Sequence, residues 1–333
     1  MRMILRITGV LLLLGSTTAA SAAPSFSDVP EQHPAFSAAE YLREEGILEG
    51  YADGTFRPTV TVNRAEAIKI IVTGLIDQPA DVAAQTPFTD VPSDAWFAPY
   101  TLHAYEQLQI IDGPPAMRSF FPECTVTKAE FLKMLLLAYD IDAVNSYGDI
   151  TYPLASDVAD STAWFYPYMR YAITASMIAP RETLLEPGEP LTRSDVADIL
   201  YSLLLYRDGK RTQTLLSTAE NEILTAYRMI ESDAPQQAKF AAARAIVASR
   251  GALSSQPTES VIKATVKTSE AAFAMASASL KIEERNTTGA IADAGTAWHL
   301  AEKAKTFSSS LNALANQAQK MAAKLADEAR LRN

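Results

Sequence analysis

The sequence predicts a mainly α-helical protein in two parts: three helix–loop–helix repeats, then an Ala-rich antiparallel helical bundle or coiled coil. Three observations support this fold class. A short motif recurs three times at nearly constant spacing, each copy leads into a segment with helix-capping signals, and the last third combines many alanines with apolar residues in steps of three and four. We therefore place the repeats at 23–86, 87–150 and 151–211, and a helical domain at 212–333.

Two motifs define the repeats. The first reads FSDVP from Phe26, FTDVP from Phe88 and ASDVA from Ala155, and the second reads VNRAEAIKI from Val62, VTKAEFLKM from Val126 and LTRSDVADI from Leu191. From the aspartate of the first to the basic residue of the second the distance is 36, 38 and 36 residues. A unit of about sixty residues with two short helices buries its apolar face poorly alone, so we expect the three units to pack as one body with clefts between them.

Repeat 1 carries the clearest local signals. We expect a first helix near 36–45 that ends at Gly46, a turn-rich connector, and a second helix over about 63–75. Asn63 stands at the cap position with Glu66 three residues later, which is the pattern of a capping box. Arg64 then places a cation at the positive end of the helix, so it either points into water or awaits an anion.

The last third differs in composition. Residues 212–333 hold 29 alanines but only two prolines, Pro235 and Pro257, which favours helix. Breaks near 232–235, 251–258 and 286–289 predict four helices over about 212–232, 235–250, 259–284 and 290–331. The apolar seams favour an antiparallel bundle within one chain, and the alternative is self-association through 290–331.

Charge and cysteine usage limit the partners. Residues 1–22 read as a signal peptide, so we expect an exported mature chain with 27 basic against 39 acidic residues, a net charge of −12. This charge argues against nucleic acid and anionic membranes as bulk partners. The single cysteine, Cys124, has no internal disulfide partner; we expect a partly buried thiol, with an intermolecular disulfide as the alternative.

The repeats resemble the S-layer homology family over about Phe26–Tyr206, through F-x-D-V, the G-I-L-E-G-Y-x-D-G-x-F-x-P turn and the R-A-E helix start. The resemblance implies a pseudo-threefold body around a central helix bundle. It also implies grooves between repeats that bind cell-wall polysaccharide, often an acidic glycan with pyruvyl ketals. In that family the arginine of the second motif is a key ligand of the ketal carboxylate.

Carried onto this sequence, the resemblance makes Arg64, Arg193 and, more weakly, Lys128 the expected carboxylate ligands. Lysine keeps the charge but lacks the bidentate fork of arginine. Pairing of Arg64 with Glu66, and of Arg193 with Asp195, is the structural alternative.

Other expected glycan contacts fall into three groups. The aspartates would accept hydrogen bonds from sugar hydroxyls, or else cap turns. The tryptophans would stack on sugar rings, or else pack in the core, which is somewhat more favoured for each tryptophan taken singly. The glycines would let the glycan approach the backbone closely. These residues are Asp28, Asp90 and Asp157; Trp96 and Trp164; Gly46, Gly50 and Gly113, with Glu66 as a further lining residue.

The repeats depart from the family pattern unequally. Repeat 1 has Pro34 in the place of the usual tryptophan. At the positions of Gly46 and Gly50, repeat 2 replaces the first glycine by Gln109, and repeat 3 replaces the two by Ser176 and Pro180. We therefore expect unequal grooves, of which one or two bind glycan.

Catalysis finds little support, because no familiar catalytic, metal-binding or cofactor-binding motif occurs and the three histidines lie far apart. The favoured function is a non-catalytic cell-envelope anchor at the cell surface, with a helical spacer or assembly domain and no cofactor. The alternatives are a cell-wall-anchored glycan hydrolase with its active site in 212–333, and an S-layer lattice subunit.

Overall fold

A computed structural model describes residues 24–76, 79, 86–113, 116–181 and 183–332, so the predicted signal peptide lies outside the described residues. Within these ranges the chain forms eleven α-helices and one short 3-10 helix, and no sheet. The prediction of a mainly α-helical fold is confirmed. None of the described helices is both long enough and apolar enough to cross a membrane.

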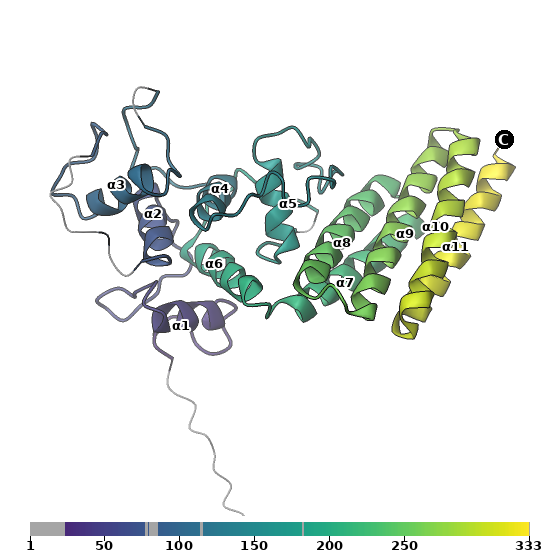
Figure 1. The fold of residues 1–333 in the computed structure, drawn as a ribbon, viewed down its shortest axis with the longest axis horizontal. Helices are drawn as coiled ribbons and strands as arrows, with labels where there is room; N and C mark the ends of the chain where they lie inside the picture. The colour runs from purple at the N-terminus through teal and green to yellow at the C-terminus, as the bar shows by residue number, and fades with distance from the viewer. Residues whose placement is uncertain (1–23, 77–78, 80–85, 114–115, 182, 333) are drawn as a thin grey trace, which may run out of the picture.

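Each repeat contributes two helices, as the sequence predicts. They lie on one side of the molecule in Figure 1 and are α1 (Phe36–Glu44) and α2 (Arg64–Thr73), α3 (Ala98–Glu106) and α4 (Lys128–Ala138), and α5 (Tyr166–Thr174) and α6 (Arg193–Arg207). Their buried apolar side chains form one continuous core. A shared core is the expected outcome for units too small to bury their own apolar faces.

A closed ring of backbone hydrogen bonds joins the three repeats just before α2, α4 and α6. Val62 donates to the carbonyl of Leu191 at 2.9 Å, Leu191 donates to Val126 at 3.0 Å, and Val126 donates back to Val62 at 3.1 Å. Each repeat therefore donates once and accepts once. This cyclic pattern supplies the pseudo-threefold relation that the resemblance implies.

The same ring holds the N-termini of the second helices. Each begins with a complete capping box, formed by Asn63 with Glu66, Thr127 with Glu130, and Thr192 with Asp195. The first helical N–H of each then donates to a carbonyl of a different repeat, at 2.9 Å in all three cases. Amides that a helix start leaves unpaired are thus satisfied across the repeat boundary.

The C-terminal part contains five α-helices where the sequence predicted four. They are α7 (Thr212–Glu231), α8 (Pro235–Ser255), α9 (Ser260–Glu283), α10 (Thr287–Phe307) and α11 (Asn312–Leu331), with the 3-10 helix η1 (Ser309–Leu311) before the last. Helix α8 also continues through Gly251, where a break was expected. Successive helices run antiparallel, and α9 lies against all four others (Figure 1).

The prediction of one long helix over 290–331 is wrong. Ser308 adopts an extended backbone and its side-chain oxygen accepts the N–H of Ser310, so the chain turns back on itself. Helices α10 and α11 then form a hairpin in which Lys305 and Glu302 contact Gln319. The steps of three and four run across this turn without interruption because both helices face the same Ala-rich core.

The helical part is docked firmly on repeat 3. Ala243, Ile246 and Val247 of α8 belong to the core of the repeats. A Cβ atom at Gly251 would lie 1.9 Å from the carbonyl oxygen of Thr174 in α5, so the two helices approach closely there. The two parts therefore share packed surface.

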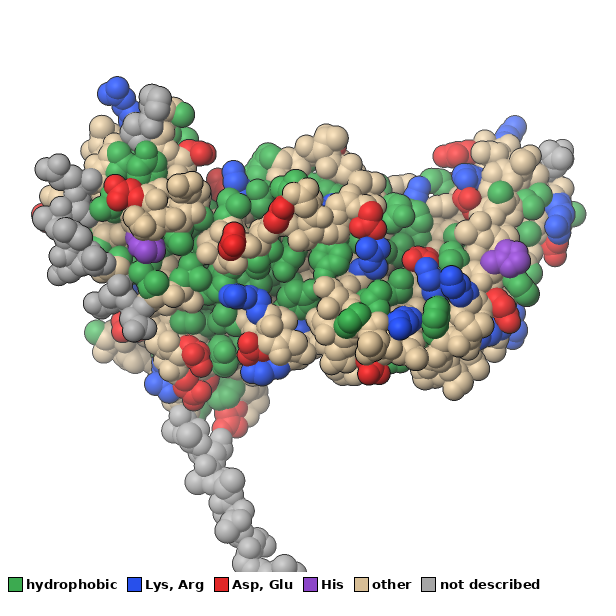
Figure 2. All heavy atoms as spheres, in the orientation of Figure 1, with side chains coloured by type: hydrophobic (Ala, Val, Ile, Leu, Met, Phe, Trp, Pro, Cys, Tyr) green, Lys and Arg blue, Asp and Glu red, His purple; other side chains and the backbone are tan. Residues whose placement is uncertain are grey.

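The two parts differ in charge. Residues 23–211 carry 13 basic and 27 acidic residues, whereas residues 212–333 carry 14 basic and 12 acidic residues. On the face drawn in Figure 2, basic side chains gather more on the helical half than on the repeats. The strong net negative charge of the chain therefore belongs to the repeats.

Candidate functional site

A groove with a cavity volume of about 360 Å³ lies where all three repeats meet. The loop 46–51 of repeat 1 lines it together with Glu66, Lys69 and Thr73 of α2. Trp96 and Tyr100 of repeat 2 and Arg193 of repeat 3 also line it. The groove thus combines cations, carboxylates and aromatic rings drawn from the whole body.

Arg193 is held rigidly at this groove and is only 8% exposed. Its Nε donates to the carbonyl of Phe56 at 2.8 Å and its Nη2 donates to the carbonyl of Glu49 at 3.0 Å. The guanidinium carbon also lies 4.9 Å from the centre of the Tyr51 ring. Carbonyl oxygens and an aromatic ring orient the Arg193 guanidinium, and none of these contacts involves a carboxylate. The guanidinium is therefore preorganised to bind an anion.

Arg64 and Lys128 make the corresponding contacts at the other two repeat boundaries. Arg64 Nε donates to the carbonyl of Phe120 at 2.9 Å, and Lys128 Nζ donates to that of Leu185 at 2.7 Å. Arg64 therefore does not simply point into water, and its predicted alternative partner Glu66 serves the capping box instead. Of the three basic residues, Arg193 is the one that lines the groove of repeat 1.

The three aspartates shape the turns that receive these basic side chains. Asp28 accepts the backbone N–H groups of Phe56 at 2.7 Å and Arg57 at 2.8 Å. Asp90 and Asp157 accept the N–H groups at the equivalent positions of repeats 2 and 3. The second residue of each turn has a positive φ, near 58° at Arg57, 59° at Phe121 and 54° at Glu186. The carboxylates thus hold a left-handed turn, and the carbonyl before each turn residue accepts from the basic side chain of another repeat.

Trp96 and Trp164 are surface residues, with exposed fractions of 53% and 55%. The interpretation that each packs in the core is therefore wrong, because Phe97 and Phe165 turn inward while the neighbouring tryptophans turn outward. Lys69 Nζ lies 5.9 Å from the Trp96 ring, and Lys133 Nζ lies at the same distance from the Trp164 ring. Sequence reasoning missed both lysines, although each follows its motif's basic residue by five positions.

The predicted glycines have backbone and packing roles. Gly46 ends α1 with a φ of 70°, and Gln109 and Ser176 adopt the same left-handed conformation at the equivalent positions. A Cβ atom at Gly50 would lie 2.6 Å from the Phe26 ring, and one at Gly113 would lie 2.3 Å from the Tyr105 ring. Gly46 and Gly50 also line the groove.

Cys124 does not match its expectation. Its side chain is exposed, so the predicted partly buried thiol is wrong. It lies in the loop that follows Pro122, where its carbonyl accepts the N–H of Arg64.

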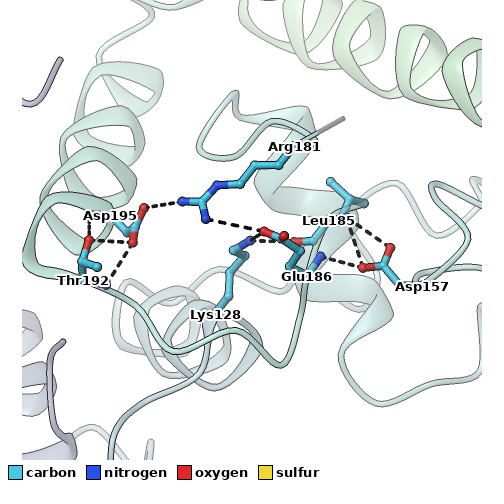
Figure 3. A network of polar contacts seen from close by, with 7 residues as sticks. All are labelled: Lys128, Asp157, Arg181, Leu185, Glu186, Thr192 and Asp195. Atoms are coloured by element: carbon cyan, nitrogen blue, oxygen red, sulfur yellow. Dashed lines mark hydrogen bonds and ion pairs between the residues drawn. The ribbon is translucent and has the colours of Figure 1, made fainter. Parts of the chain in front are cut away.

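The boundary at which Lys128 of repeat 2 meets the turn of repeat 3 is here called the third boundary. It carries a network of ion pairs (Figure 3). Glu186 lies 3.5 Å from Lys128 and 3.7 Å from Arg181, and Arg181 in turn lies 3.1 Å from Asp195. Asp198 stands at the position equivalent to Lys69 and Lys133. Burial, followed by the nearby charge of Asp195, raises the pKa of Asp198 to about 6.

Comparison with known proteins relates the first two repeats to a known domain family. The S-layer homology domain family matches residues 25–68 and 87–132. S-layer protein EA1 of Bacillus anthracis is 30% identical over 182 residues, 54% of this chain and 20% of that protein. An S-layer protein of Bacillus licheniformis is 35% identical over 122 residues, 37% of this chain and 14% of that protein. A more distant match is an amylopullulanase of Thermoanaerobacterium thermosulfurigenes, 26% identical over 181 residues, 54% of this chain and 9% of the enzyme. The chain spans a fifth or less of the length of these relatives.

Proposed function

Because residues 25–68 and 87–132 are S-layer homology domains, we propose that this cell-surface protein anchors itself by binding an anionic, pyruvylated cell-wall polysaccharide in the groove of repeat 1. The binding is non-covalent and non-catalytic. Repeats 23–86, 87–150 and 151–211 form the anchor, and 212–333 is a spacer or assembly domain.

The observation that supports this proposal is the meeting of Arg193, Lys69 and Trp96 in one groove. A ketal carboxylate presents two oxygens to a guanidinium, and the adjacent sugar ring presents C–H groups to an aromatic face. Glu49 and Glu66 line the same groove and would accept hydrogen bonds from sugar hydroxyls. Arg64, Lys128 and the three aspartates would support the site by holding the repeats together.

The helical domain has an assembly role in this proposal. S-layer proteins among the relatives make an S-layer lattice subunit the second candidate. In that case self-association would use surfaces of the docked helical array, since the single helix over 290–331 does not exist. A protein that forms sheets in solution fits the lattice role, and one that stays a monomer or small oligomer fits the anchor.

The test is a sedimentation assay of the whole mature chain with purified cell-wall sacculi, before and after their secondary polysaccharide is stripped. We expect binding to intact sacculi only, and a loss of about tenfold or more in Lys69→Met and in Trp96→Ala. Lys303→Met, which removes an exposed lysine of α10, is the matched control and should bind normally. Equal binding to stripped sacculi, or full binding by both groove variants, would contradict the proposal.

A further inference from the structure

The third repeat boundary has side chains that its two counterparts lack. Glu186 occupies the turn position held by Arg57 in repeat 1 and Phe121 in repeat 2. Arg181 occupies the position of Tyr51, whose ring lines the groove of repeat 1. A carboxylate and a guanidinium therefore stand together where the first groove has an arginine and an aromatic ring.

The Glu186 carboxylate lies between two cations of the third boundary. Its Oε2 lies 3.5 Å from Lys128 Nζ and 3.7 Å from Arg181 Nη1, so the same oxygen faces two cations (Figure 3). Lys128 is only 7% exposed, and its ammonium needs an anion nearby because a buried, uncompensated charge is costly. Arg193, its equivalent in the first groove, has two carbonyl contacts and no such carboxylate in them.

We infer that Glu186 is an internal ligand of Lys128 and Arg181 and keeps the third boundary closed to anionic glycans. The inference rests on the proposed function, because closure here means exclusion of a glycan. The ion-pair network around Glu186 is observed independently of that function. An incoming carboxylate would have to displace Glu186 and break its contacts with both cations. Binding is then confined to the grooves in which Lys69 and Lys133 stand beside Trp96 and Trp164.

Three further features distinguish this boundary. Repeat 3 has Asp198 at the position equivalent to Lys69 and Lys133. Repeat 1, which follows repeat 3 in the ring as repeat 2 follows repeat 1, has Pro34 at the position equivalent to Trp96 and Trp164. Arg211, the residue just before α7, donates to the carbonyl and the hydroxyl of Ser176 within the same repeat, at 2.6 and 2.9 Å. The third boundary thus lacks both the lysine and the aromatic ring that line the groove of repeat 1.

The first test is chemical rescue of Glu186→Gln in the full mature chain. The variant leaves Lys128 without its carboxylate, so we expect a Tm about 2–4 °C below that of the natural protein in sodium chloride. Sodium acetate at the same concentration should restore most of this loss by placing a carboxylate between the two cations. Glu189→Gln, an exposed glutamate three residues away, makes the same charge change and should show neither the loss nor the rescue.

The double variant Lys128→Met with Glu186→Gln should lose the acetate response, because the ammonium that recruits the anion is gone. Equal Tm values of Glu186→Gln in acetate and in chloride would overturn the inference. This readout contains no glycan, so it stands apart from the proposed function.

The second test counts sites by calorimetric titration with a synthetic monosaccharide that carries a pyruvyl ketal. We expect Glu186→Gln to bind one additional equivalent per chain that the natural protein and Glu189→Gln do not bind. This equivalent should be weaker than the first by about tenfold or more, because the third boundary has no counterpart of Lys69 or Trp96. An unchanged site number in Glu186→Gln would contradict closure by this carboxylate. Absence of binding by the natural protein would contradict the proposed function instead, and the acetate rescue would then decide the inference.

Discussion

Arg193 and Phe56 lie 137 residues apart in the chain, yet the Nε of the arginine donates to the carbonyl oxygen of the phenylalanine at 2.8 Å. This bond ties the last helix of repeat 3 to the turn of repeat 1. The same side chain lines the groove where we propose that a glycan carboxylate binds. Folding and recognition therefore use one residue, and variants must separate the two roles.

Replacement of Arg193 by lysine keeps the charge but removes one of the two carbonyl contacts, because an ammonium cannot span Phe56 and Glu49 as the guanidinium does. We expect a loss of about 1–2 kcal/mol of unfolding free energy in urea denaturation. Binding to sacculi should fall further than this loss of stability explains, since the fork is also lost. A variant as stable and as adhesive as the natural protein would contradict both roles.

Asp28→Asn tests whether the aspartates hold turns. The carboxylate accepts two backbone N–H groups, and an amide retains only one oxygen as acceptor. We expect a loss of about 1–3 kcal/mol of stability, measured by urea denaturation. Asp94→Asn changes an exposed aspartate of repeat 2 and is the control. If Asp28→Asn kept full stability but lost glycan binding, the direct ligand role would be the better account.

Gly251→Ala tests the junction between the repeats and the helical domain. The added methyl group would lie 1.9 Å from the carbonyl oxygen of Thr174, so α8 and α5 would have to separate. We expect a loss of about 1–3 kcal/mol in thermal or urea unfolding. Gly295→Ala in α10 meets nothing within 4 Å and should instead be neutral or stabilising by about 0.5–1 kcal/mol. Equal effects of the two substitutions would mean that the junction is loose.

Asp198 predicts a dependence of stability on pH. Its folded pKa of about 6 lies above the ordinary value of 3.8, so between these values the folded state binds more protons than the unfolded state. The contribution of this residue to stability therefore falls as pH rises from about 4 to 6, and the penalty is complete above pH 6.

Asp198→Asn removes this penalty. We expect the variant to exceed the natural protein in stability by about 1 kcal/mol at pH 7, after allowance for partial solvent screening, and to match it near pH 4. Urea denaturation at both pH values measures the difference. A gain of the same size at both pH values would rule out titration of Asp198 as the cause.

Local sequence patterns determined much of this protein. The two repeated motifs, the cap residues Asn63, Thr127 and Thr192, and the Ala-rich seams predicted three helix pairs followed by antiparallel helices. These signals are readable because capping and periodicity act within a few residues of the chain. The motifs also indicated the family to which the first two repeats belong.

Tertiary structure decided which of these residues meet. Ring closure across the repeats brings Arg193, rather than Arg64, to the groove of repeat 1, beside a lysine that no motif marked. Closure likewise sets Glu186 against Lys128, and the turn at Ser308 folds the last predicted helix into two. The physical reason is the same in each case: contacts between residues far apart in the chain depend on how the repeats and helices pack, and one-dimensional spacing does not contain that information.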